Sequence, residues 1–293
     1  MQLRHIRYLL AVAEHGNFTR AAQALHVSQP TLSQQIIQLE QTLGVVLLDR
    51  SGRTVKTTDA GSVYIEHARR ALLELESGRR AILDVQELER GELRLATTPT
   101  FTAYLVGPLL TQFQTQYPGI TVRLKEMSLD TISAAVAADE VDLGIAFRVL
   151  RPNDEIECET LLTERLSVVV GRHHGFFTRK RSITPQMLAA ERLCLLSPDF
   201  ATRDHVDDYM RLQKIAPAIV MEANTIGALI EVVRRSSLVT ILPEAIGEQH
   251  ADLRNIAISP APKPRTAALL RRRDAYQSAA ALAFTRLCRL VHA

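Results

Sequence analysis

Residues 17–44 read NFTRAAQALHVSQPTLSQQIIQLEQTLG and predict two short helices joined by a tight turn. Thr19 is the expected N-cap of the first helix. One side of that helix is apolar and carries Ala21, Ala22 and Leu25. A helix with one apolar side packs against its neighbours, so these residues predict a small, compact helical unit.

The second helix of this stretch has a clear start and one buried stripe. Ser28 is placed to cap it, and Pro30 stands in its first turn, where a missing N–H costs little. Apolar residues then recur at spacings of four, three and four, at Leu32, Ile36, Leu39 and Leu43.

The opposite side of the second helix is polar and uncharged. It carries Gln29, Thr31, Ser33, Gln34, Gln38 and Gln41. Such side chains hydrogen-bond base edges in the major groove of DNA. An exposed helix that serves only solubility usually carries Glu and Lys, and only Glu40 lies nearby. We therefore expect a DNA-reading helix rather than a helical hairpin with a solvated face.

From Leu3 to Gly61 the chain resembles the winged helix-turn-helix of LysR-type transcriptional regulators. The stretches that carry the resemblance are Leu3–Tyr8, Ala11–Glu14, Phe18–Ala22, Val27–Ser33, Gln38–Glu40, Leu43–Gly44, Leu47–Arg50 and Thr57–Gly61. We expect base contacts from Gln29, Thr31, Ser33 and Gln34, with Pro30 against a thymine methyl. Members of the family often carry arginine where Gln34 stands, which leaves the preferred base step open.

The net charge of +3 is unevenly distributed. Residues 1–58 hold six Lys or Arg against three acids, whereas residues 59–90 hold five against seven. The basic excess accompanies the helix-turn-helix, as phosphate binding requires. Residues 50–56 favour a short β-hairpin, the wing. We expect Arg50 and Arg53 to contact backbone phosphates or a minor groove, and a solvated turn is the alternative.

From Asp59 to Arg90 the pattern changes to one long amphipathic linker helix that Gly91 ends. A narrow apolar seam runs along it, made of Ile65, Ala68, Leu72, Leu75, Ile82, Val85 and Leu88. Such a seam favours helix pairing between two copies of the chain, and a two-fold dimer implies a pseudo-palindromic operator. Packing of this helix on its own chain is the alternative.

Residues 91–293 alternate strand and helix signals, which predicts a mainly parallel α/β sheet covered on both faces. Ligands of such sheets bind outside the carboxyl ends of strands. Residues 98–102 and 197–203 each follow a strand and open a helix. Their hydroxyl and N–H groups favour a small anion, and ordinary helix capping is the alternative.

This region resembles the effector-binding domain of LysR-type regulators, which is similar to type 2 periplasmic binding proteins. The resemblance implies lobe I at 91–163 and 267–293 and lobe II at 164–266, with crossings near Leu162–Arg165 and Arg265–Ala268. A small effector is expected between the lobes. The residues expected to bind it are Thr98, Thr100, Thr102, Ser128, Phe147, Arg148, Ser197, Phe200 and Thr202.

A finer likeness is to the cyanate-operon regulators of the family. It rests on Thr97–Thr102, Gly144–Phe147, Phe200–Arg203, Glu222–Asn224 and Arg234–Leu238. It implies cyanate or a similar anion as effector and a cyanate-metabolism operon as target. A regulator of another operon with a different effector is the alternative, and a solute-binding module is the other class considered.

Other functions lack sequence support. The chain has no GxSxG, HExxH, Walker A or GxGxxG motif, so we expect neither an enzyme nor a cofactor. Cys158, Cys194 and Cys288 stand singly, which favours core residues over a metal site, a disulfide framework or a peroxide-sensing thiol pair. No run of eighteen apolar residues exists and Met1 leads into an amphipathic helix, so a cytoplasmic protein without membrane contact is expected.

The complete prediction is an α/β protein with an N-terminal all-α winged helix-turn-helix at 1–58, a linker helix at 59–90 and a two-lobed effector domain at 91–293. Its expected partners are double-stranded DNA, a small anionic effector, RNA polymerase and further copies of itself, as a dimer or a dimer of dimers.

Overall fold

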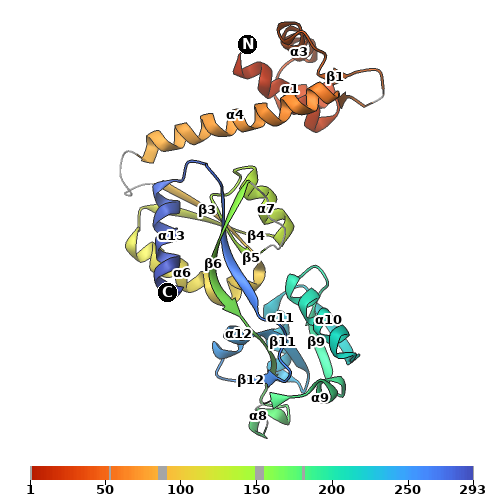
Figure 1. Ribbon diagram of the computed structural model, residues 1–293, viewed down its shortest axis with the longest axis vertical. Helices are drawn as coiled ribbons and strands as arrows, with labels where there is room; N and C mark the ends of the chain where they lie inside the picture. The colour runs from red at the N-terminus through yellow and green to blue at the C-terminus, as the bar shows by residue number, and fades with distance from the viewer. Residues whose placement is uncertain (1, 53, 85–90, 149–154, 180–181, 293) are drawn as a thin grey trace. The chain divides into compact units, whose positions relative to one another are not determined.

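A computed structural model describes residues 2–52, 54–84, 91–148, 155–179 and 182–292 (Figure 1). The chain forms two compact units, residues 1–79 and 80–293. The elements of the N-terminal unit are α1 (Leu3–His15), α2 (Phe18–Ala24), α3 (Gln29–Leu43), β1 (Leu48–Asp49), β2 (Lys56–Thr57) and the start of α4 (Asp59–Asp84). Strands β1 and β2 pair antiparallel, which confirms a hairpin here, although its strands lie at 48–49 and 56–57 rather than within the predicted range 50–56.

Local capping explains where the helices of the N-terminal unit begin and end. Asn17 caps α2, because its side chain accepts a hydrogen bond from the Arg20 N–H at 3.0 Å. The prediction of Thr19 was wrong, since the helix already starts at Phe18. Ser28 caps α3 as predicted, accepting from the Thr31 N–H at 3.3 Å.

The predicted stripe of α3 forms the core of this unit. Leu32, Ile36 and Leu39 are fully buried among residues of α1, α2 and β1. Leu43 is 36% exposed, so its predicted burial was wrong. It is the last residue of the helix, and Gly44 then turns the chain with a φ of 68°.

The seam of α4 divides into two parts. Ile65 and Ala68 are buried, and Ile65 joins the core of the N-terminal unit. Leu75 and Ile82 are 52% and 72% exposed. The first part therefore packs on its own chain, and the second part is free for another partner. Val85 and Leu88, together with the predicted helix end at Arg90, lie outside the described residues.

The C-terminal unit contains two sheets, one in each lobe. Lobe I has the strand order β4-β3-β5-β13-β6, with β3 (Gly91–Thr97), β4 (Ile120–Glu126), β5 (Leu143–Phe147), β6 (Ile156–Glu164) and β13 (Arg265–Arg272). Lobe II has the order β10-β9-β11-β7-β12-β8, with β7 (Leu166–Gly171), β8 (Ser182–Ile183), β9 (Arg192–Leu196), β10 (Ala218–Ala223), β11 (Val239–Pro243) and β12 (Leu253–Ile258).

Both sheets are mixed rather than mainly parallel as predicted. β13 is antiparallel to its neighbours β5 and β6, and β7 is antiparallel to β11 and β12. The cause lies in the crossings between the lobes. Two neighbouring strands run parallel when a crossover connection, usually a helix, joins them. β6 instead continues through Arg165 into β7 of the other lobe, without such a helix.

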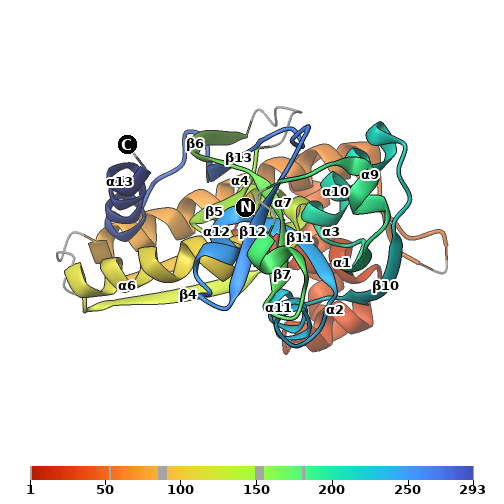
Figure 2. The same ribbon diagram turned by 90° about the horizontal axis from the view of Figure 1, so that it is seen from below.

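Helices cover both faces of each sheet. In lobe I, α6 (Gly107–Gln116) and α13 (Ala279–His292) lie side by side (Figures 1 and 2), with the Phe113 and Phe284 rings 5.4 Å apart. The opposite face packs on α7 (Leu129–Ala137). The helices of lobe II are α8 (Phe176–Arg179), α9 (Pro185–Ala189), α10 (Ala201–Gln213), α11 (Ile226–Arg235) and α12 (Glu244–Glu248). No helix in the described ranges is long and apolar enough to cross a membrane.

The crossings differ slightly from the predicted lobe boundaries. β6 ends at Glu164 and β13 begins at Arg265, and these two residues pair in the sheet of lobe I. The predicted boundaries therefore placed Glu164, Arg265 and Thr266 in the wrong lobe. Because Arg165 alone separates β6 from β7, the strand pattern of the sequence runs through the crossing without a break.

Candidate functional site

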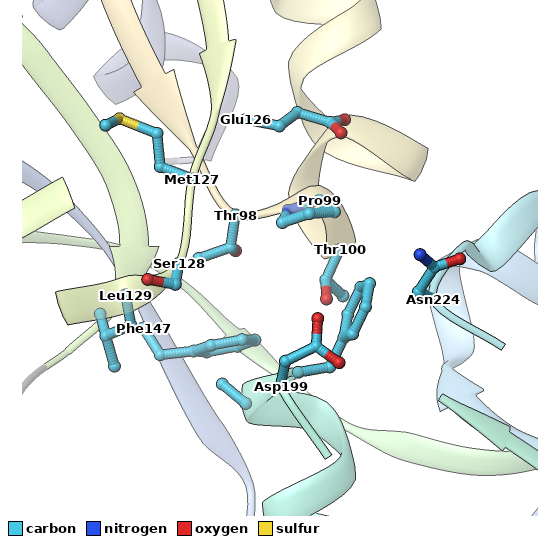
Figure 3. A pocket seen from close by; sticks show the side chains of 12 residues that line it. Thr98, Pro99, Thr100, Glu126, Met127, Ser128, Leu129, Phe147, Asp199 and Asn224 are labelled. Carbon is cyan, nitrogen blue, oxygen red and sulfur yellow. The ribbon is translucent and has the colours of Figure 1, made fainter. Parts of the chain in front are cut away.

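A cavity of about 310 Å³ lies between the two lobes (Figure 3). Its walls follow the carboxyl ends of parallel strands in both sheets, where ligands of α/β sheets bind. Lobe I contributes Thr98 to Thr100 after β3, residues 126–129 at the end of β4, and Phe147 at the end of β5. Lobe II contributes residues 199–201 after β9 and Asn224 after β10.

The loop after β3 opens a long helical stretch with an irregular turn. α5 (Pro99–Phe101) passes into a π-helical turn, η1 (Thr102–Val106), before α6 begins. Such turns often occur at functional sites. Thr98 precedes this stretch and is 5% exposed, and its hydroxyl has no hydrogen-bond partner among the described residues. A buried unpaired hydroxyl is costly, so a ligand atom that bonds it would contribute strongly to affinity.

The two predicted effector loops meet across the cavity wall. The hydroxyl oxygens of Thr100 in lobe I and Thr202 in lobe II lie 3.1 Å apart and form a hydrogen bond. Arg265 donates to the Thr202 hydroxyl at 3.2 Å and to the Ala201 carbonyl at 3.1 Å. These bonds join the lobes directly behind the cavity.

Arg265 belongs to a buried polar cluster that the sequence analysis did not identify. It forms an ion pair with Glu164, whose other carboxylate oxygen accepts from the Tyr104 hydroxyl at 2.8 Å. The Arg265 guanidinium carbon lies 3.8 Å from the centre of the Phe147 ring, a cation–π contact. Removing one member of such a buried pair leaves the other charge uncompensated, which is strongly unfavourable. In the sequence, the signal for this pair was an acidic residue, Glu164, directly before the first crossing and a basic residue, Arg265, directly after the second.

Burial shifts the pKa values of this cluster. It raises the pKa of the Glu164 carboxyl, and the Arg265 charge and the Tyr104 hydroxyl offset part of that rise. Burial likewise lowers the pKa of Arg265, against the opposing charge of Glu164. Each charge is stabilised by the other charge rather than by water, so this ion pair links the two crossings.

The structure brings most of the predicted effector residues together. Those that line the cavity are Thr98, Thr100, Ser128, Phe147 and Phe200. Thr202 lies just behind it, hydrogen-bonded to Thr100. Pro99, Asp199 and Ala201 also line the cavity and belong to the two predicted loops. The other described lining residues were not predicted, and they are Glu126, Met127, Leu129 and Asn224. All of these residues lie at the end of a strand or the start of a helix, and this position is the feature by which the sequence could have identified them.

Besides Thr202, three more predicted effector residues are not among the described residues that line the cavity. Thr102 falls in the π-helical turn, and its hydroxyl is buried with no partner in the part of the chain that the structure describes. Ser197 donates its hydroxyl hydrogen to Asp199 instead. Arg148 is exposed. Partial burial of Cys158 on β6 raises the pKa of its thiol, and the Arg148 charge opposes that rise.

The described lining is acidic. It contains the carboxylates of Glu126 and Asp199 but no Lys, Arg or His. Carboxylates already neutralise the arginines nearby. Arg265 pairs with Glu164, and Arg203 pairs with Glu222 at 2.5 Å and Asp207 at 2.8 Å. The field inside the cavity therefore disfavours a bare anion.

The cysteines divide into two buried thiols and one exposed thiol. Cys194 and Cys288 are fully buried, which confirms them as core residues. Burial raises the pKa of Cys194 to about 11 and that of Cys288 to about 12, so the reactive thiolate is disfavoured. Cys158 is exposed, and its predicted place in the core was wrong.

The predicted DNA-reading side of α3 is open to solvent. Gln29, Pro30, Thr31 and Gln34 are exposed, and Ser33 is half-buried. No charged side chain interrupts this side, so base edges could reach its amide and hydroxyl groups.

Arg50 anchors the wing to α3. Its guanidinium donates to Glu40 at 2.7 Å and lies 5.2 Å from the centre of the Phe18 ring. Glu40 also accepts from the backbone N–H groups of Leu47 and Leu48. Glu40 thus partly neutralises the charge of Arg50 within the N-terminal unit. Arg53 lies outside the described residues.

Comparisons with known proteins match both parts of the chain. Residues 3–62 match the model for the bacterial regulatory helix-turn-helix of the lysR family, and residues 86–292 match the LysR substrate binding domain. The transcriptional regulator ClcR of Pseudomonas putida is 33% identical, over 84% of this chain and 84% of its own. A hydrogen peroxide-inducible genes activator of Pectobacterium carotovorum subsp. carotovorum is 30% identical, over 93% of this chain and 90% of its own.

A solved structure shows the same architecture at full length. Full-length CbnR complexed with its target DNA aligns over 99% of each chain, with a TM-score of 0.62 and 27% sequence identity. With two family models that together span most of the chain, the resemblance seen in the sequence is confirmed. The chain belongs to the LysR family and is a DNA-binding transcriptional regulator with a helix-turn-helix unit and a two-lobed effector-binding domain.

Proposed function

We propose that this regulator converts the binding of a small molecule between its lobes into a change in transcription from the promoter it occupies. The observation that carries the proposal is the cavity of about 310 Å³, whose walls come from both lobes. The Thr100–Thr202 hydrogen bond joins those walls. A ligand there acts through its difference in affinity for two arrangements of the lobes.

The proposed reading face is the exposed side of α3. Gln29, Thr31, Ser33 and Gln34 would bond base edges, and Pro30 would contact a thymine methyl. Arg50 and Arg53 would contact the DNA backbone or a minor groove. The polar, uncharged composition of this side supports the first part, and the basic excess of residues 1–58 supports the second.

Replacing Gln34 tests the reading face. Gln34→Ala should cost about 1–3 kcal/mol on the preferred site and relax base choice at one position of each half-site. Gln112→Ala, an exposed glutamine on α6 of the effector domain, is the matched control and should leave both unchanged. The measurement is a gel shift with a randomised half-site library. Unchanged base preference in Gln34→Ala would assign the reading face elsewhere.

For assembly, we propose a homodimer that pairs through the exposed part of α4 on a pseudo-palindromic operator. Leu75 and Ile82 support it, because large apolar side chains that are more than half exposed gain free energy when a partner covers them. Pairing of two dimers and contact with RNA polymerase complete the proposal.

The effector's identity is the finer question. The likeness in sequence favours cyanate or a similarly small anion, held by Thr100, Thr202 and neighbouring N–H groups, and control of a cyanate-metabolism operon. Two observations favour a different effector and therefore another operon. Thr100 and Thr202 already bond each other, and the lining carries Glu126 and Asp199.

A further inference from the structure

We infer that the effector is a small amine with a hydrogen-bond acceptor at its other end, of which free amino acids are the simplest members. The negative charges of Glu126 and Asp199, which line the cavity from different lobes, attract its ammonium group, and its acceptor binds the Thr98 hydroxyl. The inference rests on the proposed function, because it takes the interlobe cavity as the effector site.

The ammonium subsite follows from the charges of the lining. Glu126 ends β4 in lobe I, and Asp199 lies in the loop after β9 of lobe II. Both carboxylates are exposed, and neither forms an ion pair within the described chain. A cation between them gains attraction from both lobes at once, so it favours their approach. A bare anion meets repulsion from the same groups.

The acceptor subsite follows from hydrogen bonding. Of the hydroxyls in the described lining, Thr100 bonds Thr202 and Ser128 bonds Thr131 at 2.9 Å, whereas Thr98 has no partner although it is 5% exposed. Figure 3 shows Thr98 beside Ser128 and Phe147, with Asn224 on the other side of the cavity.

The start of α7 strengthens this subsite. α7 spans Leu129–Ala137, and the Ser128 side chain does not cap it. Its first backbone N–H groups therefore favour a carboxylate on the ligand. Together with the two acidic side chains, this arrangement suits a zwitterion better than either a bare anion or a bare cation.

The size and walls of the cavity agree with such a ligand. About 310 Å³ is at the small end of sites for metabolite-sized molecules, and cyanate would leave most of it unfilled. Phe147 and Phe200 line it and can cover an apolar part of the ligand.

Isothermal titration calorimetry on the full-length protein tests the ligand class. The probes are the twenty standard amino acids, their N-acetyl derivatives and cyanate. We expect at least one amino acid to bind. Its N-acetyl derivative, which lacks the positive charge, should bind at least about tenfold more weakly, because it loses both charge pairs. Cyanate should give no saturable heat.

Charge-removing variants identify the site. The double variant Glu126→Gln with Asp199→Asn should weaken amino-acid binding about tenfold and leave the fold intact, because both side chains are exposed. Glu140→Gln combined with Glu248→Gln also removes two negative charges, one from an exposed position of each lobe outside the described lining, and should bind like the wild type.

The outcomes separate the inference from the proposed function. Binding of cyanate without binding of any amino acid overturns the amine class and leaves the interlobe effector site standing. Equal binding of an amino acid and its N-acetyl derivative also overturns the amine class, as does the absence of heat with every amino acid. If an amino acid binds the double variant and Thr100→Val as tightly as the wild type, the ligand lies elsewhere and the interlobe site fails as well.

Discussion

At Gly61, the absence of a side chain allows the first turn of α4 to pack against the backbone at Leu47. A Cβ atom at this position would lie 2.0 Å from the Leu47 carbonyl oxygen, far inside van der Waals contact. The first turn of α4 therefore packs directly on the backbone that leads into the wing. Gly78 lies on the same helix, and nothing stands within 4 Å of its added Cβ.

These two glycines form a matched pair for a test of stability. Gly61→Ala should destabilise the N-terminal unit by about 1–3 kcal/mol, because neither backbone can move away freely. Gly78→Ala should instead stabilise it by about 0.5–1 kcal/mol, since alanine loses less conformational entropy in a helix. Urea unfolding of the full-length protein, followed by circular dichroism, measures both. Equal stability of the two variants would refute the close contact at Gly61.

Among the elements, α4 has a buried part and an exposed part that its sequence pattern does not separate. Its apolar positions repeat along the whole helix, but Ile65 and Ala68 serve the core of their own unit while Leu75 and Ile82 remain exposed. Ionic contacts mark the polar sides, such as Arg79 with Glu76 at 3.0 Å. Among the described seam residues, Leu75 and Ile82 are therefore exposed enough to support a dimer.

A charge in the exposed half of the seam tests the dimer. Leu75→Asp combined with Ile82→Asp should abolish dimerisation and operator binding, because burying unpaired carboxylates in an apolar interface is strongly unfavourable. The chain itself should stay folded, since both side chains are exposed. Leu212→Asp on α10, where Leu212 is 68% exposed, is the control and should remain dimeric. Sedimentation velocity reads out the assembly, and a dimeric double variant would place the interface elsewhere.

Over the whole effector domain, hydrogen bonds that cross from lobe to lobe cluster near the crossings. Thr100 bonds Thr202, and Gln249 of lobe II donates to the Tyr104 carbonyl of lobe I at 3.0 Å. Tyr104 in turn bonds Glu164. Because these bonds hold one arrangement of the lobes, a ligand that exchanges them for its own contacts shifts the balance between arrangements.

Thr100 is the member of this set that also lines the cavity, so its hydroxyl tests the coupling. Thr100→Val keeps the shape and removes an interlobe hydrogen bond worth about 0.5–1.5 kcal/mol. We expect the effector response to be abolished while operator affinity stays within about twofold, because no DNA contact changes. Thr115→Val on α6, an exposed threonine outside the described lining, is the control. Gel shifts with and without effector measure both, and an unchanged response in Thr100→Val would contradict the switch.

The sequence by itself determined the features that depend on neighbouring residues. Ser28 and Gly44 mark the two ends of α3, and the spacing of Leu32, Ile36 and Leu39 marks its buried side. Caps and helical periods act over three or four residues, so they can be read without the fold. The family resemblance and the two effector loops follow from such local patterns as well.

Only the tertiary structure decided what meets at the cavity. Glu164 and Arg265 stand 101 residues apart and pair because β6 and β13 are neighbours in the sheet of lobe I. Glu126 and Asp199 come from different lobes and make the lining of the cavity acidic. The two loops at 98–102 and 197–203, taken alone, had predicted a site for an anion. Contacts between distant segments depend on strand order and register, which local patterns do not encode. The charge of the site, and with it the class of effector, therefore emerges only when the chain is folded.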